Sequence, residues 1–504
     1  MTNKDDRQVR DYFETDHLKY KIGQRAVSGG RVSVISRVIG YTIQMVGIIV
    51  LARLLSPGDF GLVAMVTAIT EVFYVFKDLG LSYATIQEPS LNHGQISTLF
   101  WMNLSFGIIV TLLIIAISPA IAWFFHKPQL QLITIVSSLN FLLIGLSTQH
   151  LALLQRNLEF VSVAIVEIAA TFMSTVIAIG LAWQGWGYWS LVSRPLILGL
   201  LTTLGVWFFC RWRPGRPVRR SGVRSMLKFG ANTLMAYLFD YVTLNLDKTL
   251  IGRKYGADQI GYYQRAVYLS KFASNTITMS LMNVAVATLS KLRDEPDQYR
   301  RYYLKAFSIV SFVGMPISLF MFIMSREIVF IILGPKWDQT ATIFSVLGLS
   351  TGMYLIYNTN GWLHLSLGRS DRFKKWTIGA AIVYFAAIVI GLAISVMGVA
   401  IAYTVATFLL TIPCVLYAGK PIGLRIGEIL SNLWRFLLAA ILSGVICRFL
   451  LFKIMSTDLV LLNLLLNLVV YAILYVALVV LFFGSPKPII GYFNLLRRFN
   501  RKIV

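Results

Sequence analysis

Residues 51–62 read Leu-Ala-Arg-Leu-Leu-Ser-Pro-Gly-Asp-Phe-Gly-Leu, and residues 251–262 read Ile-Gly-Arg-Lys-Tyr-Gly-Ala-Asp-Gln-Ile-Gly-Tyr. Each stretch separates two long apolar runs, which is typical of a helix end, a tight turn and the start of the next helix. At an offset of 200 residues, Arg53 matches Arg253 and Gly61 matches Gly261. A match at one fixed offset, with flanking runs that keep step, indicates a duplicated unit.

The chain is apolar along most of its 504 residues, since 57% of them are hydrophobic and 13% are charged. Soluble proteins carry about 25% charged residues. Apolar runs of roughly twenty residues recur, and each is long enough to cross the hydrocarbon core of a bilayer as a helix. The sequence therefore predicts an all-α polytopic membrane protein, because a transmembrane β-barrel would show short alternating segments instead.

We predict fourteen membrane helices, of which the first twelve form two pseudo-symmetric six-helix bundles. They lie at about 32–54, 60–83, 96–125, 129–154, 160–184, 188–212, 225–252, 259–291, 298–325, 337–367, 373–396, 399–418, 429–452 and 459–483. An even number of helices separates the copies, so the repeat is parallel, with a pseudo-twofold axis along the membrane normal. A further similarity aligns residues 155–160 with 368–373, placing Arg156 and Arg369 alike before a helix.

The predicted domains follow from these helices. They are a cytoplasmic tail with an interfacial segment (1–31), an N-terminal lobe (32–212), a basic cytoplasmic linker (213–224), a C-terminal lobe (225–418), two additional helices (429–484) and a basic cytoplasmic tail (485–504).

The formal net charge of +24 could indicate a nucleic-acid partner, but membrane orientation explains it better. With the N-terminus inside, the inner segments hold 31 of the 46 lysines and arginines, and the outer loops hold 7. Cytoplasmic loops carry such an excess of basic residues. We therefore expect both termini in the cytoplasm and no nucleic-acid partner.

Charged residues inside the predicted helices are the candidate functional residues, because each costs roughly 2.5–3.5 kcal/mol at mid-helix. Asp240 and Asp247 are seven residues apart, hence on one helix face, where the first copy has Gly40 and Gly47. Helix 60–83 likewise carries two acids seven apart, and at the repeat offset the first of them, Glu71, falls on Lys271. We predict that the first two helices of each bundle surround a polar cavity.

Two sets of candidates follow from their charge. The cationic set could bind a diphosphate, since guanidinium and ammonium groups pair with phosphate oxygens: Arg37, Arg194, Arg265 and Lys271. The acidic set could carry a coupling ion or act as counter-ions: Glu71, Asp78, Glu167, Asp240 and Asp247. The alternatives are snorkelling or local pairing for Arg37 and for Lys77–Asp78, a packing hydrogen bond for Glu167, and a private ion pair for Asp247–Lys248.

The sequence offers no cofactor or metal motif. Cys210, Cys414 and Cys447 fall in or beside apolar runs without CxxC spacing, so we expect buried free thiols. The acidic residues 294–297 are better explained as the start of a helix than as a metal site. No P-loop is present, which argues against ATP as a direct energy source.

Several stretches together resemble the polysaccharide transporter family, in its colanic and teichuronic acid exporter branch. They are Ala26–Gly30, the repeat stretch Leu51–Leu62, Asp78–Gln87, Leu158–Phe160, Arg265–Tyr268 and Gly334–Trp337. The family belongs to the multidrug/oligosaccharidyl-lipid/polysaccharide flippase superfamily.

The resemblance implies a V-shaped fold and alternating access that moves an undecaprenyl-diphosphate-linked oligosaccharide to the outer leaflet, coupled to an ion gradient. In the lipid II flippase of this superfamily, basic residues on helices 1, 2 and 8 line a cationic cavity, and Arg37, Lys77 and Arg265 lie on the corresponding helices here. Its two additional C-terminal helices form a lipid groove, a role that helices 13 and 14 could take.

The function expected from this resemblance is a non-enzymatic flippase or exporter for exopolysaccharide or capsule assembly. We expect it in the bacterial inner (plasma) membrane, as a monomer, with lipid-linked oligosaccharide, membrane lipids and polysaccharide polymerase or export machinery as partners. A cation-coupled multidrug exporter of the same superfamily is the first alternative, although a cationic cavity favours an anionic substrate. A polytopic glycosyltransferase or polymerase is the second, although no loop is long enough for the usual catalytic domain.

Overall fold

The computed structural model describes residues 22–76, 81–87, 91–218, 224–448 and 460–484. Inside these ranges, the side chains of 22–27, 75–76, 83–84, 87, 224–244 and several residues of 273–284 are left out of the description. The described chain is all-helical and divides into two compact units, Met1–Gly261 and Tyr262–Val504. The predicted lobe boundaries remain predictions, as do the two terminal tails.

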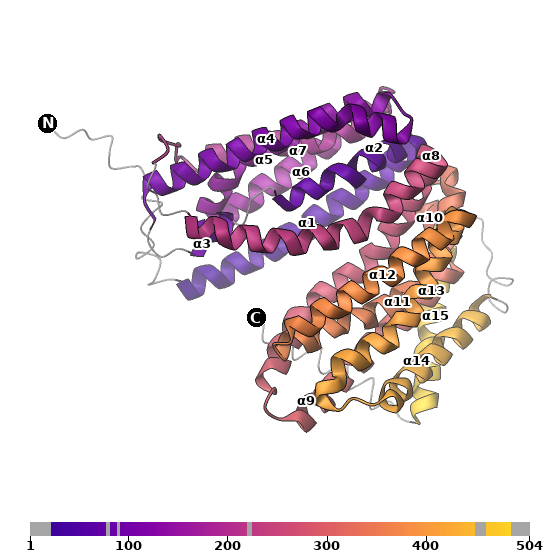
Figure 1. Cartoon of the computed structure of the whole chain (residues 1–504). Helices are drawn as coiled ribbons and strands as arrows, with labels where there is room; N and C mark the ends of the chain where they lie inside the picture. The colour runs from indigo at the N-terminus through magenta and orange to yellow at the C-terminus, as the bar shows by residue number, and fades with distance from the viewer. Residues whose placement is uncertain (1–21, 77–80, 88–90, 219–223, 449–459, 485–504) are drawn as a thin grey trace. The chain divides into compact units, whose positions relative to one another are not determined.

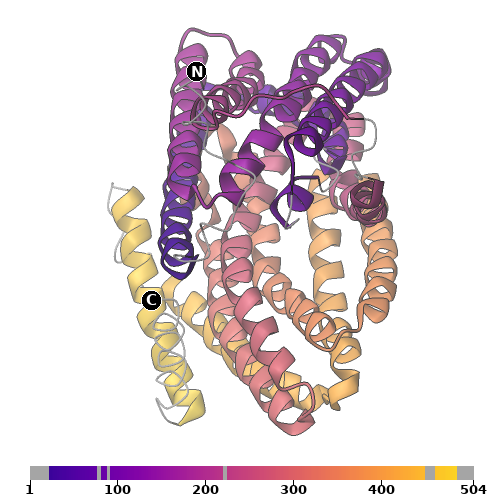
Figure 2. The ribbon, with the colours of Figure 1, turned by 90° about the vertical axis from the view of Figure 1, so that its left-hand side faces the viewer.

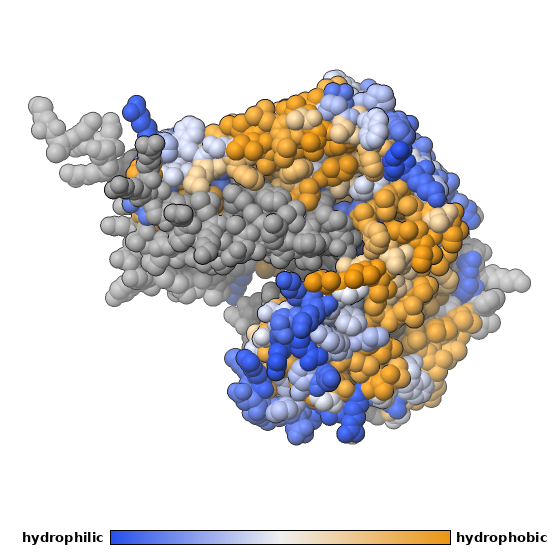
Figure 3. Space-filling view, in the orientation of Figure 1, coloured by the Kyte–Doolittle hydropathy of each residue, from blue (hydrophilic) through white to orange (hydrophobic). Residues whose placement is uncertain are grey.

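Unit 1 holds the first seven α-helices and part of the eighth (Figure 1). They are α1 (Ile22–Leu54), α2 (Pro57–Thr70), the 3-10 helix η3 (Glu71–Phe76), α3 (Leu81–Gln87), α4 (His93–Phe125), α5 (Gln129–Arg156), α6 (Phe160–Trp183), α7 (Tyr188–Phe209) and the first part of α8 (Arg224–Lys291). Helix α1 packs on α6, and α5 packs on α4 and α7. Among the coloured residues of this unit, apolar residues form a band along its upper part, with hydrophilic residues at both ends of that band (Figure 3).

Unit 2 holds the rest of α8 and seven further α-helices. They are α9 (Pro296–Ile323), α10 (Ser325–Ile332), the 3-10 turn η4 (Pro335–Trp337), α11 (Asp338–Ser366), α12 (Ser370–Ile394), α13 (Val396–Gly419), the 3-10 turn η5 (Lys420–Ile422), α14 (Ile426–Ile446) and α15 (Val460–Phe483). Helix α11 packs on α9 and α13, and α14 packs on α9 and α15. Figure 2 shows α15 at the edge of this unit.

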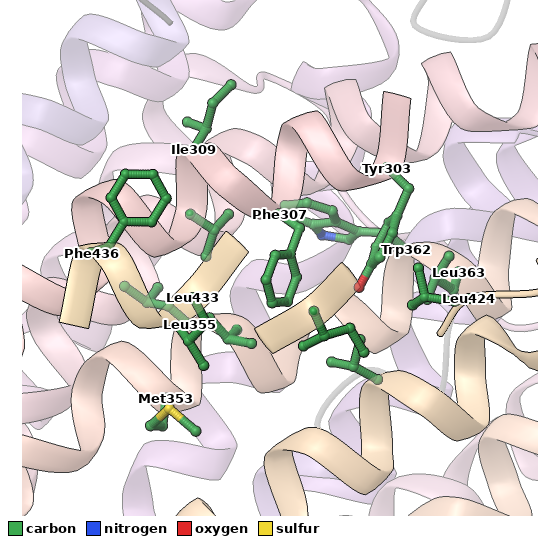
Figure 4. Packing of buried hydrophobic residues seen from close by; sticks show 14 of the residues in the cluster. Tyr303, Phe307, Ile309, Met353, Leu355, Trp362, Leu363, Leu424, Leu433 and Phe436 are labelled. Carbon is green, nitrogen blue, oxygen red and sulfur yellow. The ribbon is translucent and has the colours of Figure 1, made fainter. Parts of the chain in front are cut away.

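The core of unit 2 joins α9, α11 and α14 through large side chains (Figure 4). Tyr303 and Phe307 of α9 lie against Trp362 of α11, and Phe436 of α14 extends the same cluster. The Tyr303 hydroxyl forms a 2.9 Å hydrogen bond with Thr359 Oγ1, so its polar end is satisfied inside the apolar cluster. Tyr475 and Val479 of α15 belong to the same cluster, so both α14 and α15 are part of the core of unit 2.

Eleven helices of the described chain are long and apolar enough to cross a membrane. Three predicted helices have no separate counterpart among them. Residues 60–83 were expected to form one helix, but α2 ends at Thr70 and the 3-10 helix η3 follows. The two predicted helices at 225–252 and 259–291 lie in α8, which is interrupted at Gly256. The multi-pass all-α fold is thus confirmed, while the count of fourteen spans remains a prediction.

Two details differ from the expectations. The helix predicted at about 188–212 is α7, which ends three residues earlier, at Phe209, and the chain continues without helix to Val218. The alignment of Arg156 with Arg369 also fails, because Arg156 ends α5 whereas Arg369 caps the start of α12. Each turn has a residue with positive φ two residues before the next helix, Leu158 before Phe160 and Gly368 before Ser370, which corresponds to an offset of 210 rather than 213.

Candidate substrate and coupling sites

The two repeat stretches break their helices at the same place by different chemistry. Ser56 caps α2: its Oγ accepts from the Asp59 N–H at 3.2 Å, and its own N–H donates to Asp59 Oδ2 at 2.9 Å. At the repeat offset of 200, Gly256 interrupts α8 with φ 83° and ψ −175°. That backbone conformation is essentially restricted to glycine. The predicted repeat thus has a matching structural break in both copies.

The matched glycines pack against the other copy of the stretch, within the residues of unit 1. A Cβ placed on Gly61 would lie 1.7 Å from the Ala257 carbonyl oxygen, and one on Gly261 would lie 2.0 Å from that of Pro57. The two contacts are equivalent under the repeat, because Gly61 corresponds to Gly261 and Ala257 corresponds to Pro57. Both glycines are therefore required by close backbone approach.

Candidate residues Arg37 and Glu167 lie on facing helices of unit 1. Helices α1 and α6 run parallel, because Gly29 meets Phe160 and, further along both helices, Gly47 meets Thr175. Arg37 and Glu167 lie between these two contacts, both with exposed side chains. The positive charge of Arg37 acts on the Glu167 carboxylate. The structure thus brings one cation of the predicted set beside one predicted acid.

Asp240 and Asp247 were predicted to share one helix face in the first part of α8, and the structure describes the side chain of Asp247. Asp247 is buried, and its Oδ1 accepts from the Lys248 backbone N–H at 2.8 Å. The Lys248 ammonium donates to Asn245 Oδ1 at 2.6 Å. Asp240 lies in α8, but its side chain falls outside the description. A polar cavity shared by Asp240 and Asp247 remains a prediction.

Glu71 and Asp78 were expected on one face of a continuous α-helix, and the structure does not continue that helix past Thr70. Glu71 is exposed and begins the 3-10 helix η3, so regular α-helical spacing stops at this residue. Lys77 and Asp78 lie outside the described residues. The nearby Tyr74 hydroxyl accepts a hydrogen bond from Asn140 Nδ2 and lies within the field of the Glu71 charge.

The remaining cations are divided between the units. Arg194 is half-buried in α7 of unit 1. Arg265 and Lys271 are half-buried in the part of α8 that belongs to unit 2. The Arg265 guanidinium carbon lies 5.4 Å from the centre of the Tyr268 ring, which is within cation–π range. Their convergence with Arg37 on one diphosphate remains a prediction.

Sequence reasoning missed a buried aromatic cluster in unit 1. His150 of α5 is fully buried and stacks on Trp207 of α7, with ring centres 4.4 Å apart. Phe100 and Trp212 meet the same imidazole edge-on. The signal in the sequence was Trp212 within a basic, proline-containing stretch, because a tryptophan there has no role in membrane orientation.

The chemistry of the described chain matches the expectations on thiols. Cys210, Cys414 and Cys447 are free and buried. Among the described residues, no group of three His, Cys, Asp or Glu side chains could hold a metal ion. The stretch 294–297 begins α9 with Pro296 in the first turn, but its N-cap residue, Glu295, makes no side-chain capping hydrogen bond.

These features define a multi-pass α-helical membrane protein with two related halves and ionisable residues inside its helices. The chain belongs to the Polysaccharide biosynthesis protein family, which it matches over residues 50–342. The family expected from the sequence is thereby confirmed.

Individual comparisons agree with this family. The chain is 26% identical over 423 residues to the Lipopolysaccharide biosynthesis protein WzxC of Escherichia coli (strain K12), covering 82% of this chain and 84% of that protein. It is 25% identical over 398 residues to the Teichuronic acid biosynthesis protein TuaB of Bacillus subtilis (strain 168), covering 77% and 82%. The inward closed structure of the lipid II flippase MurJ is similar with a TM-score of 0.69 and 16% identity, covering 91% of this chain and 99% of that one. That similarity concerns the fold.

Proposed function

We propose that this protein is a flippase that moves an undecaprenyl-diphosphate-linked oligosaccharide from the cytoplasmic to the outer leaflet by alternating access. Four cations within its membrane helices carry the proposal: Arg37, Arg194, Arg265 and Lys271. A diphosphate bears negative charge on several oxygens, and guanidinium groups bind such oxygens through paired hydrogen bonds. The polysaccharide-related names of WzxC and TuaB support a glycan as the cargo.

A reconstituted transport assay tests this proposal. The full chain is placed in liposomes with a fluorescent undecaprenyl-diphosphate oligosaccharide, and exposure of the sugar outside is measured with a lectin. We expect Arg265→Ala and Lys271→Ala to lower transport at least tenfold. Arg326→Ala is the matched control, because Arg326 lies outside the predicted spans in an exposed 3.2 Å ion pair with Asp338. Transport at the wild-type rate by both variants would remove these residues from the site.

The same assay separates the flippase from a multidrug exporter. A cationic cavity should prefer an anionic diphosphate and repel a cationic drug. We therefore expect cationic drugs, at concentrations that saturate drug exporters, to leave transport of the lipid-linked sugar unchanged. Competition by cationic drugs, together with drug efflux, would favour the exporter.

We further propose that Arg37 and Glu167 take part in ion coupling. Glu167 lies within the electrostatic influence of Arg37 on the adjacent helix, so a cation or proton that binds Glu167 would weaken its attraction to Arg37. Glu167→Gln should abolish the dependence of transport on an imposed proton or sodium gradient while leaving downhill exchange. Gradient-dependent transport in this variant would exclude Glu167.

The protein would act in the bacterial inner membrane with both termini in the cytoplasm, as the distribution of basic residues predicts. As a monomer without catalytic activity, it would deliver repeat units to a polysaccharide polymerase. A reporter that is active only in the cytoplasm should be active when it is fused after residue 504. Activity of a reporter that works only in the periplasm would show that the C-terminus lies outside the cytoplasm.

A further inference from the structure

The non-helical segment Cys210–Val218, called here the strap, is bound to the start of α4. The Gly215 N–H donates to Ser97 Oγ at 2.9 Å, and the Gly215 carbonyl accepts from Trp101 Nε1 at 2.8 Å. The Val218 N–H donates to Thr98 Oγ1 at 2.9 Å. Three hydrogen bonds thus fix the backbone of the strap on one helix of unit 1.

A buried tryptophan anchors the strap further. Trp212 is 3% exposed, and its indole N–H donates to His93 Nδ1 at 3.1 Å. Its ring lies edge-on to His150 and to Phe100, with centres 5.1 Å and 6.1 Å apart. Removing a large aromatic side chain from water stabilises its position, so the strap is held in place by more than its backbone.

The fixed backbone of the strap carries three exposed arginines. Arg211, Arg213 and Arg216 are all exposed. Nη1 of Arg213 donates to the carbonyls of Trp207, Cys210 and Trp212, at 3.2 Å, 3.3 Å and 2.9 Å, and the guanidinium carbon lies 5.4 Å from the centre of the Trp207 ring, so this side chain is held against the end of α7. Pro214 and Pro217 alternate with the arginines and restrict the backbone further.

Apolar side chains are exposed beside these cations. Trp101, which is bound to the strap, is 40% exposed, and Val218 of the strap is 49% exposed. Phe208 in the last turn of α7 is 76% exposed. Guanidinium groups next to exposed apolar side chains at the ends of membrane helices match a phosphate headgroup above an acyl chain.

We propose that the strap is a binding site for the phosphate group of an anionic phospholipid. Orientation by positive charge requires basic residues in a loop but no fixed structure. Ordering a loop costs backbone conformational entropy, so a fixed strap indicates a preorganised site. This inference does not depend on the transport function proposed above.

The test measures binding of fluorescent phosphatidylglycerol to the purified full chain in detergent, with fluorescent phosphatidylcholine as the neutral probe. The variant R211Q/R213Q/R216Q removes three charges from the strap. The matched control R369Q/K374Q/K375Q removes three exposed charges from unit 2. We expect the strap variant to bind phosphatidylglycerol roughly tenfold more weakly or worse, and the control to bind within about twofold of wild type.

A second variant tests the ordering itself. Ser97→Ala with Thr98→Ala removes two hydroxyl anchors from α4 and keeps every arginine. We expect about threefold weaker binding of phosphatidylglycerol by a chain that is still folded in detergent, as its circular dichroism would show. Unchanged binding by this variant, or equal loss in the strap and control triples, would overturn the proposal, because charge alone would then suffice. Binding of undecaprenyl diphosphate without binding of phosphatidylglycerol would also overturn it and assign the strap to the transported lipid.

Discussion

In α4 of unit 1 and α9 of unit 2, a proline inside the helix leaves one carbonyl without its helical N–H donor. Pro119 frees the carbonyl of Ile115, and the neighbouring Ser118 hydroxyl donates to it at 2.8 Å. Pro316 frees the carbonyl of Phe312, which accepts instead from the Tyr475 hydroxyl of α15 at 2.8 Å. The first half satisfies the carbonyl locally, whereas the second uses a helix from outside the repeat.

The repeat stretches differ in the same way. The first copy stops its helix with a serine cap and starts the next with Pro57, and the second uses the positive φ of Gly256. The backbone break is common to both copies, but the residues that produce it are not. The comparison teaches that the two halves share backbone geometry and close contacts, while hydrogen-bonding partners differ.

The largest expected effect tests the shared contact. Gly61→Ala and Gly261→Ala each place a methyl group inside van der Waals distance of a backbone carbonyl. We expect each to lower the free energy of unfolding by about 3 kcal/mol and polysaccharide export at least tenfold. Thermal unfolding in detergent and complementation of an export-deficient strain measure the two effects.

The controls are glycines with open space. A Cβ on Gly30 or Gly40 of α1 meets nothing within 4 Å, so alanine there should be neutral or slightly stabilising. A large loss in Gly61→Ala with none in Gly261→Ala would break the equivalence of the two copies.

The next effect tests the different helix breaks. Gly256→Ala forces a side chain into a glycine conformation and should cost about 1–3 kcal/mol of unfolding free energy, although nothing lies within 4 Å of the new Cβ. Ser56→Ala removes the cap of α2 and should cost about 1 kcal/mol, whereas Ser56→Gly should cost only a few tenths. A larger loss of unfolding free energy in Ser56→Ala than in Gly256→Ala would contradict this explanation of the two helix breaks by a serine cap and a positive-φ glycine.

The smallest effect tests the two proline sites by double-mutant cycles. Tyr475→Phe should cost about 0.6 kcal/mol, a typical value for a hydrogen bond between membrane helices. In a Pro316→Ala background the helix supplies its own N–H donor to the Phe312 carbonyl, so the same substitution should cost less. Ser118→Ala with Pro119→Ala gives the parallel cycle in unit 1. Equal costs of Tyr475→Phe in both backgrounds would show that its hydroxyl does not compensate for Pro316.

Hydropathy predicted most helices to within a few residues, because roughly twenty apolar residues in a row have few alternatives to a membrane helix. The matches of Arg53 with Arg253 and of Gly61 with Gly261 located the repeat, since backbone contact leaves only glycine at two of these positions. The prediction failed at the change from α-helix to 3-10 helix after Thr70, because both conformations suit an apolar run and hydropathy does not distinguish them.

Side-chain partners were less predictable than the helices. Helical spacing placed Asp247 on a membrane helix, but it could not predict the hydrogen bond that the Lys248 ammonium donates to Asn245 Oδ1. Nor could it predict that Arg37 acts electrostatically on Glu167, because their proximity depends on the packing of α1 on α6. A polar, proline-containing segment after α7 was predicted as a linker, whereas its attachment to α4 follows from hydroxyls at Ser97 and Thr98 that no pattern singles out.

Attachment of the strap to α4 also decides where this polypeptide tolerates being made as two separate fragments. A first fragment that ends after Val218 keeps Trp212 in its aromatic cluster and satisfies the hydroxyls of Ser97 and Thr98. One that ends at Phe209 leaves a cavity beside His150 and strips α4 of those partners. Two co-expressed fragments should therefore assemble better when the chain is divided after the strap than when it is divided at the end of α7.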